Sequence, residues 1–170
     1  YPAIRHLKIG HINKPFPQDD VKAAWQVCSP GTAGSFTAVG YFFGRKLHTE
    51  LGVPVGLIGS NWGGTRVEPW TPPVGFRAVP ELKDITEKVD AGLPNTDSGN
   101  QAWSAYLAGL EQWLPRAKAA VDAGKYPPAM PQRPTSLGSS HQEPTKLYNG
   151  MIAPLVPYAI RGAIWYQGES

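Results

Sequence analysis

Apolar and polar positions in the first sixty residues predict two short strands, a helix and a third strand. Residues 4–9 and 25–28 have strand length, and proline residues or a Pro-Gly pair follow each of them. Proline removes a donor from a strand ladder and glycine opens a turn, so we expect both strands to be short and the first to lie at a sheet edge.

The clearest helix is predicted to begin at Ser35, whose side chain can cap a first turn. Residues at three- and four-residue steps share one face of an α-helix. Gly52 stands where a C-terminal cap glycine is expected, so the helix should end there. The apolar positions at this spacing are Val39, Phe42, Phe43, Leu47 and Leu51.

Residues 53–59 form a continuous apolar run with the length of a buried parallel strand, and residues 160–166 are a second candidate for such a strand. A polar loop containing glycine follows each run, at residues 60–65 and 167–170. Ligands of open parallel sheets bind outside the carboxyl ends of the strands. The two loops are therefore predicted to converge on one crevice.

Residues 81–91 and 101–123 have the composition of helices. The order strand, helix, strand, helices, strand predicts an α/β fold with a doubly wound parallel sheet and flanking helices, in one domain over residues 1–170. A proline-rich loop at 124–145, of a length typical of functional or mobile loops, is expected within that domain. In the second helix one apolar face is expected, formed by Trp103, Leu107, Leu110 and Leu114.

Composition supports a folded, loop-rich protein, because 41% of the residues are hydrophobic and the chain has 19 glycines and 18 prolines. The net charge of +3 comes from scattered residues, which disfavours nucleic-acid binding. No apolar run approaches the length of a membrane span. The sole cysteine, Cys28, is expected to be buried, and no Cys/His cluster has zinc-site spacing. The N-terminal residues lack an initiator Met and a signal-peptide core, so we expect the chain to begin within a longer protein.

Candidate chemistry lies in the two glycine loops. Gly63 and Gly64 leave backbone N–H groups uncovered, as an oxyanion hole requires, although a tight turn explains them equally well. Gln167 offers an amide donor, or is a surface glutamine. Glu169 could hold Gln167 or Arg66 in place, or be solvated, and the spacing does not choose between these.

A serine nucleophile needs a histidine base that is itself oriented by a third group. Ser60 and Ser170 each follow a predicted buried strand. No histidine of the chain has an aspartate three residues before it, and surface histidine is the simpler interpretation of all four. The residues alone therefore do not include a complete catalytic site. The histidines are His6, His11, His48 and His141.

Several stretches together resemble one family and cover the chain except for about residues 75–145. They read WQVCSP at 25–30, FTAVGYFFGR at 36–45, VPVGLI at 53–58 with WGGT at 62–65, and LYNGMIAP at 147–154 leading to IWYQGES at 164–170. The chain is similar in these stretches to the sialate O-acetylesterases, close to carbohydrate esterase family 6, within the SGNH hydrolases.

The resemblance implies serine-mediated removal of acetyl groups from sugar hydroxyls, with no metal or organic cofactor and an O-acetylated sugar as the partner. It also implies that the nucleophile, in a Gly-Gln-Ser-Asn motif, and an Asp-x-x-His motif lie outside this chain. The chain is then a fragment truncated at both ends and inactive alone, from a protein that the resemblance suggests is exported. Implied oxyanion donors are Gly63, Gly64 and Gln167, with Trp62, Thr65, Gly168 and Glu169 beside them.

Two other interpretations stay open. The first is a carbohydrate-binding module without catalysis, in which tryptophans stack on sugar rings; the helical positions of Trp103 and Trp113 weaken it. The second is a structural fragment whose unpaired sheet edges prevent independent folding. The tryptophans in question are Trp62, Trp70, Trp103 and Trp113.

Overall fold

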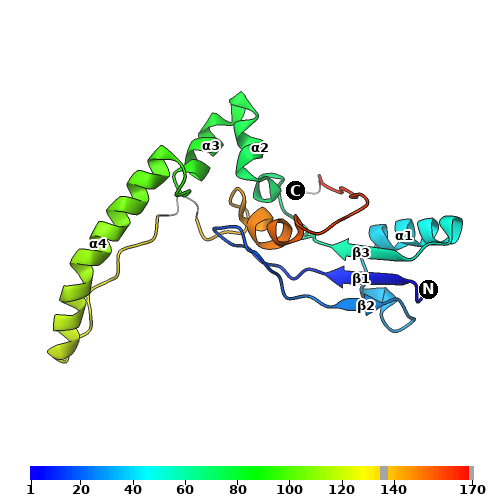
Figure 1. Ribbon diagram of the computed structural model, residues 1–170, viewed down its shortest axis with the longest axis horizontal. Helices are drawn as coiled ribbons and strands as arrows, with labels where there is room; N and C mark the ends of the chain where they lie inside the picture. Colours follow the sequence, from blue (N-terminus) through cyan, green and yellow to red (C-terminus); the bar gives the residue numbers. More distant parts are fainter. Residues whose placement is uncertain (135–137, 169–170) are drawn as a thin grey trace. The chain divides into compact units, whose positions relative to one another are not determined.

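The computed structural model describes residues 1–134 and 138–168, in two compact units. The first unit joins Tyr1–Trp70 to the segment that starts at Thr145. The second unit is Thr71–Pro144. Each unit has its own helices, and the first contains the sheet (Figure 1).

The sheet has three strands in the order β2-β1-β3 (Figure 1). The central strand β1 (Ile4–Lys8) pairs antiparallel with β2 (Trp25–Val27) and parallel with β3 (Val55–Gly59). The three strands predicted in the first sixty residues are therefore confirmed. The prediction that the first of them lies at a sheet edge is wrong, because β1 has a partner strand on each side. The sheet is mixed, so the α/β class holds while the doubly wound parallel arrangement stays a prediction.

Helix α1 (Ala38–Leu51) ends as predicted, with Gly52 in the left-handed conformation at a φ of 67°. It begins later than predicted, because Ser35 belongs to the 3-10 turn η1 (Ala33–Ser35) and Thr37 is the N-cap residue. The two residues of α1 that are buried are Gly40 and Gly44.

The apolar face of α1 is largely exposed. Four of its five residues are 46–63% exposed, namely Val39, Phe42, Phe43 and Leu51. Gly44 faces β3 instead, since a Cβ there would lie 3.0 Å from the Leu57 side chain and 3.3 Å from that of Val55. Glycine lets the helix backbone approach the sheet closely, and a search for apolar side chains does not detect that contact.

Two hydrophobic clusters form the core of the first unit. One contains Ile4, Phe36 and the buried Cys28. The other contains Ile9, Leu147 and Met151. The last two residues come from a helical segment that includes the π-helical turn η4 (Tyr148–Ile152) and the 3-10 turn η5 (Ala153–Leu155).

This helical segment holds the loop that follows β1. The backbone N–H of Lys14 donates to Lys146 O, and Asn149 Nδ2 donates to Lys14 O at 3.2 Å. A Cβ at Gly150 would lie 2.3 Å from Ile12 O, so only glycine permits the observed approach. The 147–154 motif thus fixes the chain just beyond β1.

The strand predicted at residues 160–166 is wrong. This segment joins no strand ladder among the described residues (Figure 1). Its large apolar side chains are exposed. The sequence has the composition of a buried strand, but a strand is formed only when a neighbour supplies the ladder partners. The exposed side chains, at 47–71%, include Ile160, Ile164, Trp165 and Tyr166.

The second unit is helical. It contains α2 (Pro73–Arg77), the 3-10 turn η3 (Pro80–Leu82), α3 (Lys83–Asp90) and α4 (Asp97–Asp122). Both predicted helices are confirmed, with α4 starting four residues early. Within the described part of the chain, no helix combines the length and apolar character needed to cross a membrane.

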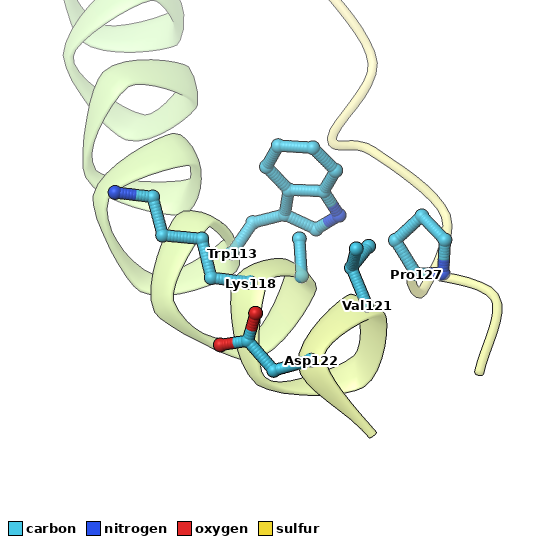
Figure 2. A pocket seen from close by; sticks show the side chains of 6 residues that line it. Trp113, Lys118, Val121, Asp122 and Pro127 are labelled. Carbon is cyan, nitrogen blue, oxygen red and sulfur yellow. The ribbon is translucent and has the colours of Figure 1, made fainter. Parts of the chain in front are cut away.

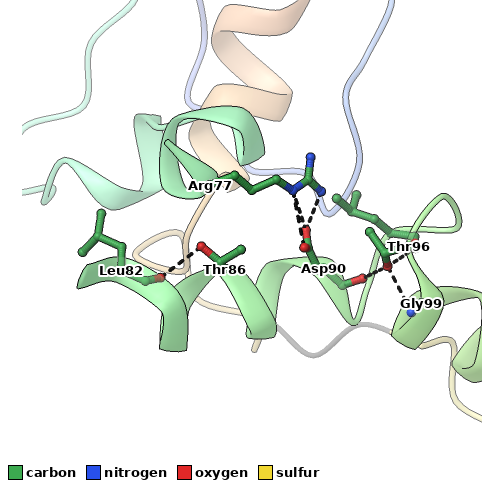
Figure 3. Close-up of polar contacts among 7 residues, drawn as sticks. Arg77, Leu82, Thr86, Asp90, Thr96 and Gly99 are labelled. Carbon is green, nitrogen blue, oxygen red and sulfur yellow. Dashed lines mark hydrogen bonds and ion pairs between the residues drawn. The ribbon is translucent and has the colours of Figure 1, made fainter. Parts of the chain in front are cut away.

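Polar contacts join these helices, as Figure 3 shows. Arg77 forms an ion pair with Asp90 across α2 and α3. The Thr96 hydroxyl accepts from the Gly99 N–H at 3.1 Å, which caps α4, and donates to the Asp90 carbonyl. Thr96 therefore sets both the start of α4 and its connection to α3.

The first residues of the proline-rich segment lie along α4. Trp113 Nε1 donates to Pro128 O at 2.9 Å, and Gly109 lies beside Pro131. A pocket of about 280 Å³ separates the end of α4 from Pro127 (Figure 2). The predicted apolar face of α4 is only partly buried, since Leu107 and Leu114 are 54% and 49% exposed.

Candidate active site

The two predicted glycine loops meet in the first unit. The side-chain amide of Gln167 donates a hydrogen bond from Nε2 to the carbonyl oxygen of Thr65, at 2.6 Å. A primary amide carries two donor hydrogens. One hydrogen of Gln167 thus fixes the side chain beside the loop that follows β3, and its amide group lies next to the Gly63-Gly64 turn.

Thr65 organises this loop. Its side chain is buried, and its hydroxyl donates to Trp62 O at 2.6 Å and accepts from Trp70 Nε1 at 2.9 Å. The residue therefore connects both ends of the loop, while its carbonyl connects the loop to Gln167. We conclude that Thr65 positions the turn and that its hydroxyl is not the reacting group.

Gly63 and Gly64 form the exposed turn of the loop. Gly64 has a φ of 70°, in the left-handed region that L side chains rarely adopt. A Cβ placed at either residue would meet no atom within 4 Å. The side of the turn on which a Cβ would stand is therefore open.

His11 lies beside the same loop and was not predicted there. Its ring stacks on that of Trp62, with the centroids 4.2 Å apart and the planes at 11°. His11 follows β1 as Trp62 follows β3, and the two strands are parallel. The carboxyl ends of parallel strands lie at the same edge of a sheet. The same argument that predicted the meeting of the two glycine loops could therefore have placed His11 near the loop after β3.

The hydroxyl of Ser60 is bonded to a backbone carbonyl group and not to a histidine. Its hydroxyl donates to the Met151 carbonyl oxygen at 3.0 Å, which ties the end of β3 to the second core cluster. His48 Nδ1 lies 2.7 Å from Val53 O, at the far end of α1. Of the other predicted residues, Gly168 is exposed with a φ of 119°, and Glu169 and Ser170 lie outside the described residues.

His6 is buried, so its interpretation as a surface histidine is wrong. It is 2% exposed and stacks on Phe36 with a centroid distance of 4.7 Å. Alternation along β1 places its side chain on the same face as Ile4, a core residue. Burial lowers the pKa of His6 below the ordinary 6.5, and the positive charge of Lys8 lowers it further.

The tryptophans proposed for sugar stacking make contacts within the protein. Trp70 donates to Thr65, Trp103 Nε1 to Gly92 O at 3.2 Å, and Trp113 to Pro128. These contacts explain the three residues without a sugar ligand. Over residues 1–134 and 138–168, no group of three or more His, Cys, Asp or Glu side chains could hold a metal ion.

The chain matches sialate O-acetylesterases from mammals. The sequence is 28% identical to that of the Rattus norvegicus protein over 89% of this chain. It is also 28% identical to that of the Mus musculus protein, over the whole chain. It is 26% identical to that of the Homo sapiens protein, again over the whole chain. The chain is therefore similar in sequence to the sialate O-acetylesterase family. It spans about a quarter of the length of these relatives, from 25% to 29%.

A solved structure agrees with this sialate O-acetylesterase relationship. A carbohydrate acetylesterase from Xanthomonas citri is 29% identical in sequence and superposes with a TM-score of 0.59. The match covers 99% of this chain and 26% of that one. No family model matches the chain.

Proposed function

We propose that the chain is part of a carbohydrate O-acetylesterase and supplies its oxyanion hole. The donors are the backbone N–H groups of the Gly63-Gly64 turn and the side-chain amide of Gln167. The observation that carries the proposal is the 2.6 Å hydrogen bond from Gln167 to Thr65, which brings the amide to the glycine turn from 102 residues away.

In the proposed reaction a serine hydroxyl attacks the acetyl carbonyl carbon and loses its proton to a histidine. The carbonyl oxygen becomes negatively charged and is stabilised by the donors of the oxyanion hole. The sugar hydroxyl leaves with that proton, and water then releases acetate from the acyl-enzyme. The substrate class is an O-acetylated sugar, and no metal or organic cofactor takes part.

The serine nucleophile and its Asp/His pair are proposed to lie outside these 170 residues. Ser60 is bonded to a backbone carbonyl, His48 lies at the far end of α1, and His6 is buried. The chain by itself is then expected to be inactive. Within the complete enzyme, Trp62, Thr65, Gly168 and Glu169 are assigned to support of the oxyanion donors and contact with the substrate.

The complete fold is proposed to be a doubly wound parallel sheet of the SGNH type. The parallel β1–β3 pair supports this proposal, as does the packing of α1 against β3. The likeness to the Xanthomonas citri acetylesterase also supports it. In such a sheet the glycine turn and Gln167 lie at the carboxyl edge, where ligands bind.

Release of acetate from 4-nitrophenyl acetate and acetylated sugars tests the proposal, in the longer protein that carries this chain. Gln167→Ala should lower kcat by about 100-fold or more, because one oxyanion donor is lost, and should change KM little. Gln132→Ala, at an exposed position of the second unit, is the matched control and should retain wild-type kcat. Full activity of Gln167→Ala would contradict the assignment.

A further inference from the structure

His6 is a buried polar side chain without a partner. Neither ring nitrogen has a hydrogen-bond partner among the described residues, although the residue is 2% exposed. A buried polar group that makes no hydrogen bond costs free energy, and such groups in folded proteins usually have a partner. The unused hydrogen-bonding capacity of His6 therefore points to a ligand.

The ring of His6 lies against the end of β3. A Cβ at Gly59 would come within 2.7 Å of His6 Nε2, so the absence of a side chain there makes room for the imidazole. The same Cβ position is 3.5 Å from Asn61 Nδ2. The His6 ring and the Asn61 amide therefore lie close to each other at the carboxyl end of β3.

A pocket of about 180 Å³ opens beside this ring. We call it the His6 pocket. The structure places it between the ends of β1 and β3 and the start of α1. Its lining residues are His6, Lys8, Ser35, Phe36, Thr37 and Asn61.

The polar groups of the His6 pocket suit an anion. Lys8 contributes an ammonium group, Asn61 an amide and Thr37 a hydroxyl that makes no capping hydrogen bond to α1. Thr37 is the N-cap residue of a 14-residue helix, and the first N–H groups of an α-helix favour negative charge. No acidic residue is among those lining the pocket.

We propose that the His6 pocket binds one small oxyanion, a carboxylate or a phosphate, through Lys8, Asn61, the start of α1 and a ring nitrogen of His6. Neither Gly63 nor Gly64 is among the residues that line the pocket, and the proposal does not depend on the esterase function. Ligand binding explains why a histidine without a partner is retained in the core between α1 and the sheet.

The charge of the ring is consistent with this assignment. Burial and Lys8 lower the pKa of His6, so in the absence of an anion the ring is neutral at pH 7 and has one donor nitrogen. Lys8 is the charged group that faces it from β1, and the lining residues from η1, α1 and the end of β3 are uncharged. A bound anion would raise the pKa of His6.

The test is nuclear magnetic resonance of the protein with ¹⁵N-labelled histidine, titrated with sodium acetate and separately with inorganic phosphate. Sodium chloride at equal ionic strength is the reference. The His6 ring signals should move with one or both oxyanions and saturate, and the more effective anion identifies the ligand as a carboxylate or a phosphate. His6 is assigned from the signals missing in His6→Gln.

Substitutions at two exposed positions of the pocket test anion binding without replacing a buried residue. Lys8→Gln and Asn61→Ala should each weaken binding by about tenfold, because each removes a hydrogen bond to a charged group. Lys22→Gln, at an exposed lysine outside the pocket, should bind as wild type does. Signals that do not respond to either anion, or equal binding by Lys8→Gln and wild type, would overturn the proposal.

Discussion

At the scale of single residues, two buried polar side chains, Thr65 and His6, differ in how their hydrogen-bonding groups are used. Thr65 uses both its hydroxyl and its carbonyl, which join Trp62, Trp70 and Gln167. Neither ring nitrogen of His6 has a hydrogen-bond partner among the described residues. The first residue is explained by the loop it stabilises, and for the second we propose a bound anion.

Replacement of Thr65 tests its role as the centre of the loop. Thr65→Val should lower the free energy of unfolding by about 1–3 kcal/mol, because the indole N–H of Trp70 and the carbonyl of Trp62 lose their partner. Urea denaturation measures the change. Thr49→Val on the exposed surface of α1 is the control and should stay within about 0.5 kcal/mol of wild type. Equal losses in both variants would show that the Thr65 hydroxyl has no special role.

His6 predicts how stability depends on pH. Its pKa is lowered in the folded protein, so below about pH 6.5 the unfolded chain binds a proton that the folded chain excludes. The free energy of unfolding should therefore fall as the pH falls from about 7 to 5, by at most about 1.4 kcal/mol per pH unit from this group.

Urea denaturation across this pH range, at constant ionic strength, compares wild type with His6→Leu. The variant should lose the part of the pH dependence that comes from His6, whatever its overall stability. His48→Leu serves as control, because His48 is only partly buried and bonds to the Val53 carbonyl. An unchanged pH dependence in His6→Leu would contradict the prediction.

At the scale of elements, α1 shows what the spacing of apolar residues can and cannot predict. The spacing of its apolar residues located the helix, and Gly52 gave its end. The spacing did not show which face meets the sheet, because the close contact with β3 is made by Gly44. Phe42 and Phe43, which belong to the apolar face, are exposed.

Two substitutions in α1 distinguish these faces. Gly44→Leu should destabilise the protein by about 1–3 kcal/mol, because the new side chain would overlap those of Leu57 and Val55. Phe42→Gln, at a position 56% exposed, should change stability by less than about 0.5 kcal/mol. Both are measured by urea denaturation. A larger loss of stability in Phe42→Gln than in Gly44→Leu would show that the apolar face of α1 is the one that packs.

At the scale of the whole molecule, the second unit is inserted into the first. The N–H of Thr145 donates to Glu68 O at 3.1 Å, so the chain leaves and re-enters the first unit at neighbouring points. The loop of residues 60–65, its hydrogen bond to Gln167 and the His6 pocket all belong to the first unit. Helices α2, α3 and α4 and the described residues of the proline-rich segment up to Pro144 belong to the second unit.

This arrangement predicts that the second unit can be removed. A short Gly-Ser linker in place of Thr71–Pro144 should leave the sheet intact, because only a short distance has to be closed. Hydrogen exchange at the β1 and β3 amides, compared with the protein that retains the second unit, measures the outcome. Loss of protection at these amides would show that the second unit is required for the first to fold.

The sequence by itself determined where the local elements lie. Short-range patterns located β1, β2, α1, β3 and both long helices of the second unit, and the family motifs identified the glycine turn and Gln167. These features depend on residues a few positions apart, such as a cap glycine or a proline that stops a strand.

Tertiary structure alone decided which of these elements meet and which side chains are buried. The antiparallel pairing of β2, the contact of α1 through Gly44, the burial of His6 and the lack of a ladder for residues 160–166 all depend on partners distant in the chain. The bond from Gln167 to Thr65 joins residues 102 positions apart. Local patterns carry no information about such partners, because pairing and packing are selected by the whole set of surfaces that the fold brings together.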